Sequence, residues 1–228
     1  MAGDSAGGNI AAAVSQRLTF EAHYSSLPKL VFQGLIYPGM QGLDFNTPSY
    51  QQNRGKPSAV ISREFAASCF CCYITMHSKF TAQIMANNHT SPAAKAIIAQ
   101  RMSHDLVPAK FKQNGYIPPS TVVETSAGDQ RVYEQFESVI LNPDHSPLIR
   151  DNLTGLPPAY MVTAGHDPLR DDGIMYVRRL EDADVEVTWM HYENGIHGMF
   201  SLFVDTFSIE SGKQSVEDFI TYSRHSLS

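Results

Sequence analysis

The sequence predicts an α/β protein in which a parallel sheet carries helices on both faces. Three observations support this fold class. Apolar runs typical of buried strands occur at 29–37, 157–164 and 185–192. Segments with helical spacing precede the first run and separate the last two. The 228 residues are 43% hydrophobic and 18% charged, which suits a globular chain with a substantial core.

The first two elements expected are a helix and a strand. From Asn9 to Phe20, the side chains of Ile10, Val14 and Leu18 recur at i, i+4 and i+8, which predicts a helix. The run 29–37 predicts a buried strand that ends at Pro38-Gly39.

Residues 40–155 interrupt this alternation. Their best helical segment is 62–76, and prolines are frequent in the remainder. We therefore expect residues 1–228 to form a single domain with an insertion at about 40–155 that carries a lid or binding surface.

The alternation resumes after the insertion. The run 157–164 predicts a second strand, and the alternating run 185–192 predicts a third. Between them, 170–183 predicts a helix with Ile174, Val177 and Leu180 on one face, and with Asp171 and Asp172 in the first turn.

Composition excludes several classes of function. The net charge of −6 does not favour nucleic acid, and no apolar run is long enough to span a bilayer. The cysteine cluster Cys69, Cys71 and Cys72 lacks the spacing of a zinc site, and we expect three small apolar residues on a buried helix. No metal ion or cofactor is expected. The absence of a secretory signal indicates a cytoplasmic chain, or a targeting segment upstream of it. The sequons at Asn88 and Asn152 would permit glycosylation in a secretory compartment.

The chain begins with the pattern G-x-S-x-G, as Gly3-Asp4-Ser5-Ala6-Gly7. This pattern is typical of a serine on a sharp turn between a strand and a helix, and such enzymes present Ser, then Asp or Glu, then His along the chain. Asp167 follows the second predicted strand, and His197 follows the third. Loops after parallel strands meet at the carboxyl edge of the sheet, so Ser5, Asp167 and His197 are the predicted catalytic triad.

Each of these residues has an alternative interpretation. A single G-x-S-x-G occurs by chance in many proteins, and Asp167 could simply cap the helix that follows it. His197 could be a turn residue between glycines. His191 is a rival base, less favoured because it lies within a strand, and His166 stands before Asp167 in the order.

Four motifs together resemble the hormone-sensitive lipase family of α/β-hydrolases. They are Gly3-Asp4-Ser5-Ala6-Gly7-Gly8-Asn9, Gly155-Leu156-Pro157-Pro158, Asp167-Pro168-Leu169-Arg170-Asp171-Asp172-Gly173 and His197-Gly198-Met199-Phe200. Within that family, 35–38 and 171–177 look most like the arylacetamide deacetylase and neutral cholesterol ester hydrolase branch. The resemblance implies a serine hydrolase that cleaves carboxylic esters, and arylamides as well, through an acyl-enzyme. It assigns one oxyanion donor to the backbone N–H of Ala6.

The resemblance also implies parts that these residues do not contain. The family carries a His-Gly-Gly-Gly loop upstream of the serine, and no His-Gly-Gly occurs in the chain. We therefore expect the C-terminal part of a hydrolase, with 30–37 left as an unpaired edge strand. Small ester or lipid-like substrates are expected, with membrane association only through an N-terminal anchor. Relatives of this branch face the lumen of the endoplasmic reticulum.

Two other functions stay open at this point. The same scaffold serves as a binding protein in the gibberellin receptors, which lack the catalytic histidine, whereas His197 is present here. An inactive truncated remnant is the third alternative.

Overall fold

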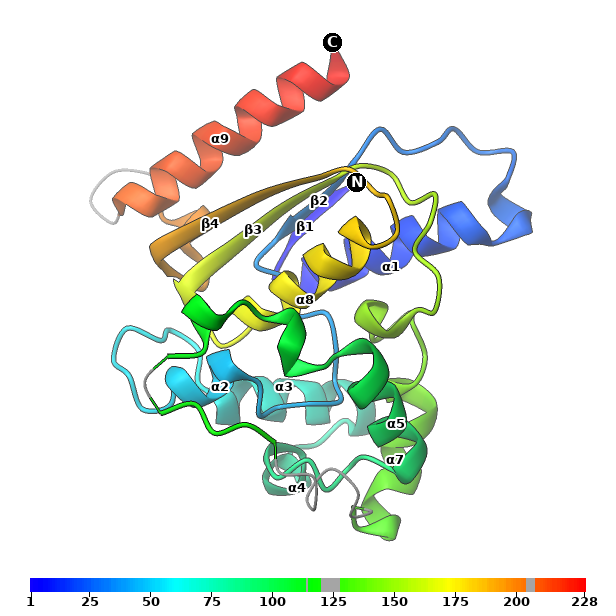
Figure 1. The fold of residues 1–228 in the computed structure, drawn as a ribbon, viewed down its shortest axis with the longest axis vertical. Coiled ribbons are helices and arrows are strands. Elements are labelled where there is room, and N and C mark those ends of the chain that lie inside the picture. Colours follow the sequence, from blue (N-terminus) through cyan, green and yellow to red (C-terminus); the bar gives the residue numbers. More distant parts are fainter. Residues whose placement is uncertain (114, 120–127, 204–207) are drawn as a thin grey trace.

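The structure, a computed structural model, describes residues 1–113, 115–119, 128–203 and 208–228. Its centre is a four-stranded sheet in the order β1-β2-β3-β4, with every neighbouring pair parallel. The strands are β1 (Ala2–Asp4), β2 (Gln33–Ile36), β3 (Ala159–His166) and β4 (Val187–Ile196). Figure 1 shows the sheet between helices. The predicted parallel sheet and its last two strands are confirmed.

The edge of the sheet differs from the expectation. β1 pairs with β2 in the register Ala2↔Gly34, and the Gly34 N–H donates to the Met1 carbonyl at 2.8 Å. The prediction that 30–37 forms an unpaired edge is therefore wrong, because a three-residue strand covers it. The predicted strand is also too long, since Val31 is 52% exposed and β2 begins at Gln33.

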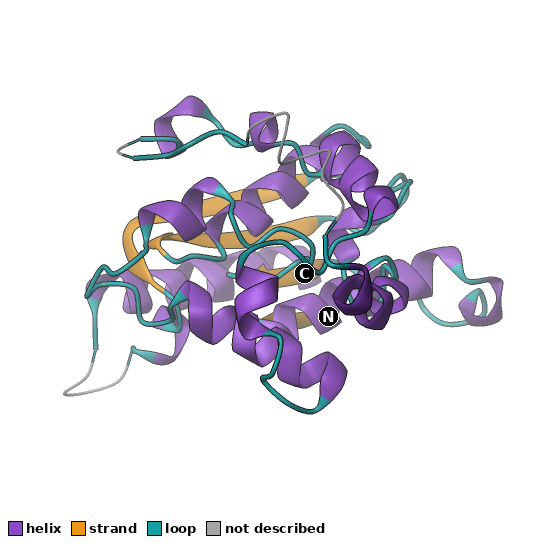
Figure 2. Ribbon diagram, turned by 90° about the horizontal axis from the view of Figure 1, so that it is seen from below, coloured by secondary structure: helices purple, strands orange, loops and turns teal. Residues whose placement is uncertain are grey.

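Helices cover both faces, as expected. Helices α1 (Ala6–Phe20) and α8 (Arg170–Glu181) lie on one face of the sheet, and α9 (Glu210–Leu227) lies on the other (Figures 1 and 2). Side chains alternate between the two faces, as the pleat of a strand requires. Leu35 and Met161 belong to the hydrophobic cluster that includes α1 and α8, whereas Tyr160 packs with Phe219 and Tyr222 of α9.

Helix α1 forms where predicted but turns a different face to the sheet. Its buried residues include Gly8, Ala11 and Ala12, whereas Ile10 is 62% exposed. A Cβ on Gly8 would approach the Cβ of Pro38 to 2.8 Å, so the helix lies too close to the chain after β2 for large side chains. The line of apolar residues that predicted this helix, Ile10, Val14 and Leu18, therefore points away from the core.

Residues 40–155 contain a second group of helices, drawn below the sheet and α8 in Figure 1. They are α2 (Pro48–Gln52), α3 (Arg63–Thr75), α4 (Thr81–Met85), α5 (Pro92–Arg101) and α7 (Gln130–Ile140). The predicted helix 62–76 is confirmed as α3, whose first turn is capped by the Ser62 Oγ accepting from the Phe65 N–H. Single 3₁₀ turns occupy Ala22–Tyr24, His104–Leu106, Ala109–Phe111, Pro147–Ile149 and Met199–Ser201.

The hydrophobic core continues from the sheet into these helices. Phe45 and Tyr50 belong to the same buried cluster as Leu35 and Met161. The expectation of three buried cysteines is wrong, because only Cys71 is buried and both Cys69 and Cys72 are exposed. Helix α3 packs through one side only, so residues on its other side reach solvent.

Candidate active site

Ser5 occupies a sharp turn between β1 and α1. Its backbone adopts φ 52° and ψ −120°, a strained conformation for a residue with a side chain. The turn is fixed by the Ser5 N–H, which donates to the carbonyl of Ile36 at 2.9 Å. Gly3 is needed here, because a Cβ at this position would lie 2.3 Å from the carbonyl oxygen of Gly7. The G-x-S-x-G pattern thus forms the strand–turn–helix expected of it.

The side chains of Ser5, His197 and Asp167 form a continuous hydrogen-bonded line. The His197 Nε2 lies 2.9 Å from the Ser5 Oγ, and its Nδ1 lies 2.8 Å from the Asp167 Oδ2. Because an ionised carboxylate only accepts, the Nδ1 carries the hydrogen and the Nε2 is left to accept from the serine hydroxyl. Asp167 is fully buried and His197 is nearly so.

Asp167 also serves the turn before α8. Its Oδ1 accepts from the backbone N–H of Leu169 at 2.8 Å, while its Oδ2 receives the histidine. Asp167 therefore does not cap α8, whose N-cap is Leu169 and has no side-chain cap bond, but its second oxygen fixes the turn before that helix. The turn fixes the carboxylate, which in turn orients the ring of His197.

Tyr37 is a neighbour of the site to which the sequence assigned no role. Tyr37 directly follows the last residue of β2 and has a φ of 35°. The centroid of its ring lies 4.9 Å from that of the His197 ring. Its hydroxyl donates to the Asp4 Oδ2 at 3.4 Å. Burial, followed by the charge of Asp4, raises the pKa of the Tyr37 hydroxyl well above its usual range. An aromatic residue at the carboxyl end of a parallel strand, directly before Pro38, was the available signal.

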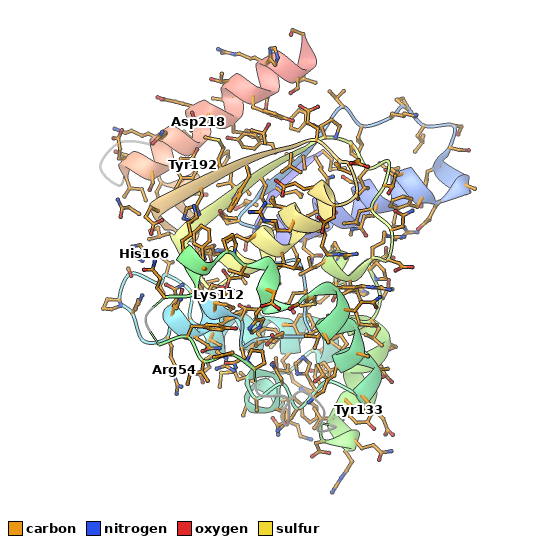
Figure 3. All side chains as sticks on the ribbon, in the orientation of Figure 1. Arg54, Lys112, Tyr133, His166, Tyr192 and Asp218 are labelled. Atoms are coloured by element: carbon orange, nitrogen blue, oxygen red, sulfur yellow. The ribbon has the colours of Figure 1, made fainter. Side chains whose placement is uncertain are left out.

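His191 is committed to other partners. The Thr163 Oγ1 accepts from the indole N–H of Trp189 at 2.8 Å and lies 2.9 Å from the Nδ1 of His191. The indole is a donor only, so the Thr163 hydroxyl hydrogen is free for that Nδ1. The Nε2 of His191 then faces Glu193 at 3.2 Å, and burial lowers the pKa of the ring. His166 is the last residue of β3, at the left of the sheet in Figure 3.

Ala6 begins α1 immediately after Ser5. It belongs to the first turn, where backbone N–H groups have no partner within the helix and the helix dipole is positive. One turn further, the Asn9 side chain donates to the carbonyls of Gly39 and His145 at 2.7 and 3.1 Å. These bonds tie the beginning of α1 to residues of the 40–155 region and to the segment after β2.

The two acids in the first turn of α8 hold the segment that follows β2. The Asp172 carboxylate accepts from the Met40 N–H and from the Gln41 side chain, each at 3.0 Å. Burial is the largest cause that raises the pKa of Asp172 to about 8. Asp171 accepts from the backbone N–H of Ser49 and pairs with Arg170 at 2.9 Å. These bonds join the beginning of α8 to the segment 40–49.

The described residues contain neither a candidate metal site nor a helix that could span a membrane. In those ranges, no three or more His, Cys, Asp or Glu side chains are grouped so that they could hold a metal ion. None of the described helices is both long enough and apolar enough to cross a bilayer.

The chain is similar to proteins of known family. A family model described as the α/β-hydrolase fold matches residues 1–103 and 84–201. Neutral cholesterol ester hydrolase 1 of Pongo abelii is 43% identical over 203 residues, covering 87% of this chain and 47% of that protein. Its Mus musculus counterpart is 40% identical over 216 residues, covering 92% and 50%. Arylacetamide deacetylase of Oryctolagus cuniculus is 37% identical over 203 residues, covering 88% and 48%.

Solved structures agree at the level of the fold. A thermostable carboxylesterase cloned from a metagenomic library superposes with a TM-score of 0.60 at 22% identity, covering all of this chain and 54% of that one. A bacterial heroin esterase gives a TM-score of 0.59 at 22% identity, covering 100% and 51%. The chain spans about half the length of the curated relatives it matches. It belongs to the α/β-hydrolase fold family, in its hormone-sensitive lipase type.

Proposed function

We propose that this chain carries the nucleophile, base and acid of a serine hydrolase that cleaves carboxylic esters. The observation that supports this most is the hydrogen-bonded line from Ser5 through His197 to Asp167. The ester hydrolase and deacetylase names of the relatives support the same reaction type. In the proposal, small ester or lipid-like molecules are the substrates, and arylamides are a further class.

The first half of the reaction acylates Ser5. The Oγ attacks the ester carbonyl carbon while the His197 Nε2 takes the hydroxyl proton. Asp167 stabilises the imidazolium that forms and keeps its Nδ1–H directed away from the serine. The proton then passes from Nε2 to the departing alcohol, which leaves an acyl group on Ser5.

The second half returns the enzyme to its starting state. Water attacks the acyl carbon, the His197 Nε2 takes its proton, and the carboxylic acid departs as Ser5 recovers its hydrogen. Negative charge develops twice on the carbonyl oxygen. The Ala6 N–H, at the positive end of α1, is the donor in this chain that we assign to that oxygen.

The experiment is hydrolysis of a short p-nitrophenyl ester by the chain and by three variants. Ser5→Ala and His197→Ala should each reduce kcat/KM to the same baseline, and the double variant should lose little more, because the triad acts as a unit. His191→Ala is the matched control and should retain most of the rate, since that ring bonds Thr163 and Glu193.

The rate of the unaltered chain should rise with pH, because only a neutral imidazole can take the proton of the serine hydroxyl. Equal activity of His197→Ala and the unaltered chain would show that His197 is not the base. A rate that survives Ser5→Ala would exclude the serine mechanism altogether.

A further inference from the structure

The end of β2 is bonded to two of the segments that carry the triad. The carbonyl of Ile36 accepts from the Ser5 N–H at 2.9 Å, and the N–H of Tyr37 donates to the carbonyl of Val162 in β3 at 2.8 Å. Asp167 directly follows β3. Tyr37 keeps a left-handed φ of 35°, which is uncommon for a bulky residue and marks a position that the surrounding contacts determine.

The ring of Tyr37 lies against the imidazole of His197. Tyr37 is fully buried, and the two ring centroids are 4.9 Å apart with the planes inclined at 53°. The nitrogens of the imidazole bond Ser5 and Asp167. Two hydrogen bonds in the plane of an imidazole leave it free to tilt about the line that joins them. A side chain packed beside the ring prevents that tilt.

The hydroxyl of Tyr37 fixes the far end of its ring. It donates to the Oδ2 of Asp4, the residue before the nucleophile, at 3.4 Å. A hydrogen-bonding contact from the backbone of Phe200, three residues after His197, acts on the same hydroxyl. Burial, followed by the charge of Asp4, raises the pKa of this hydroxyl, so it keeps its hydrogen at neutral pH and remains a donor. One phenol therefore contacts the segments that carry Ser5 and His197.

We propose that Tyr37 is a positioning residue for the general base. Its ring prevents the imidazole of His197 from tilting, so that the Nε2 stays directed to the Ser5 hydroxyl during each proton transfer. Tyr37 itself transfers no proton. This inference rests on the proposed function, because it requires His197 to be the base. Small displacements of a reacting group reduce rates strongly, so we expect the effect in the rate of reaction at Ser5.

The test is a double-mutant cycle, measured by the rate at which a fluorophosphonate labels Ser5 in the 228-residue chain. Tyr37→Leu, and Tyr37→Met as a second aliphatic replacement, should each slow labelling about 10 to 100-fold, because the base loses its support. Tyr37→Phe should stay within about threefold of the unaltered rate, because it keeps the ring and gives up one long hydrogen bond. In the His197→Ala background, Tyr37→Leu should have no further effect, because no imidazole remains to be positioned.

Tyr176→Leu is the matched control. Tyr176 of α8 is also a fully buried tyrosine, and its hydroxyl accepts from the Gln16 side chain of α1 at 3.1 Å. The variant should lose stability in denaturant unfolding, as Tyr37→Leu does, and should still be labelled at the unaltered rate. This comparison separates a loss of packing from a loss of positioning.

A second measurement requires no reaction. The Nδ1–H that His197 donates to Asp167 is a charge-assisted hydrogen bond, and its proton gives a low-field resonance in the magnetic resonance spectrum. Tyr37→Leu should shift or broaden this resonance, because the ring is no longer held in one orientation. Tyr37→Phe and Tyr176→Leu should both preserve it.

An unaltered labelling rate or an unaltered resonance in the folded Tyr37→Leu chain would overturn the proposal. Equal slowing by Tyr37→Leu with and without the His197 ring would overturn it as well, because Tyr37 would then act on the turn of the nucleophile. The proposed function fails in a different way. His197→Ala would then be labelled as fast as the unaltered chain, and Tyr37 would have no base to position.

Discussion

Asp167 shows how far residue-level prediction can reach. Its order along the chain and its place after a strand were readable from sequence, because the carboxyl ends of parallel strands meet at one edge. The two separate hydrogen bonds of its carboxylate could not be predicted: one oxygen accepts from the Leu169 N–H, and the other bonds His197. Tyr37 was missed for a related reason: its contact with the His197 ring depends on a left-handed backbone that no local pattern announces.

His89 makes a testable residue-scale contribution to stability. It is fully buried, its Nε2 lies 2.8 Å from the Gly42 carbonyl, and its Nδ1 has no hydrogen-bond partner in the part of the chain that the structure describes. Burial, the largest cause, lowers the pKa of the ring from 6.5 to about 4. The unfolded chain therefore takes up a proton below pH 6.5 that the folded chain resists until about pH 4.

We expect this histidine to remove about 3 kcal/mol of stability as the pH falls from 6.5 to 4, with the full contribution present above pH 6.5. Urea unfolding of the chain and of His89→Phe at several pH values measures this. The phenyl ring keeps the edge contacts with Phe45 and Phe136, so the variant should show a flatter dependence on pH. Parallel pH profiles of the two proteins would contradict the assignment.

At the scale of elements, the long periodic segments were the most predictable. β3, β4, α3 and α8 lie close to the predicted ranges, because their apolar patterns match the period of the structure that they form. β1 is too short to show a strand pattern of its own, and only the G-x-S-x-G motif indicated a strand before Ser5. The orientation of α1 was also hidden. Because Gly8 lies in close contact with Pro38, helix α1 turns its small residues to the sheet. The side of the helix that carries Ile10 and Val14 faces away from it.

The beginning of α8 gives an element-scale prediction. Arg170 is buried with Asp171, and donates further to Gln52 and to the carbonyl of Phe111. Asp171→Ala should cost about 3–5 kcal/mol in the free energy of unfolding, because it leaves a buried guanidinium without its carboxylate.

Glu181→Ala, at the other end of the same helix, is the control. Its ion pair with Arg178 is exposed on both sides and should contribute little. Denaturant unfolding of the two variants and of the unaltered chain measures both losses in the free energy of unfolding. Similar losses for both variants would show that Asp171 does not stabilise the contact of α8 with the segment that contains Ser49.

At the scale of the whole molecule, the fold class, the family and a match to only part of the relatives were predictable. Motif spacing identifies the family, whereas the share of the relatives that is matched comes only from comparison. A location facing the lumen of the endoplasmic reticulum stays a prediction. Asn88 and Asn152 are both exposed, whereas His89 and Thr90 of the first sequon are fully buried.

We expect the 228 residues, produced alone, to be a slow esterase. The chain contains no His-Gly-Gly sequence, and the loss of one oxyanion donor typically lowers kcat about 10² to 10³-fold. The turn that holds Ser5 also rests on a three-residue edge strand, and small displacements of a nucleophile reduce rates strongly. A version extended upstream with a His-Gly-Gly-Gly loop and its strands should be faster by orders of magnitude on the same p-nitrophenyl ester. Equal kcat/KM values would contradict this.

The most direct test of the central claim, that His197 activates Ser5, is the site and rate of labelling by a fluorophosphonate. Peptide mass spectrometry of the folded 228-residue chain should place a single adduct on Ser5. His197→Ala should slow that labelling by orders of magnitude, whereas His191→Ala should leave it nearly unchanged. An unlabelled Ser5 in folded protein, or labelling that proceeds equally fast without the His197 ring, would contradict the account.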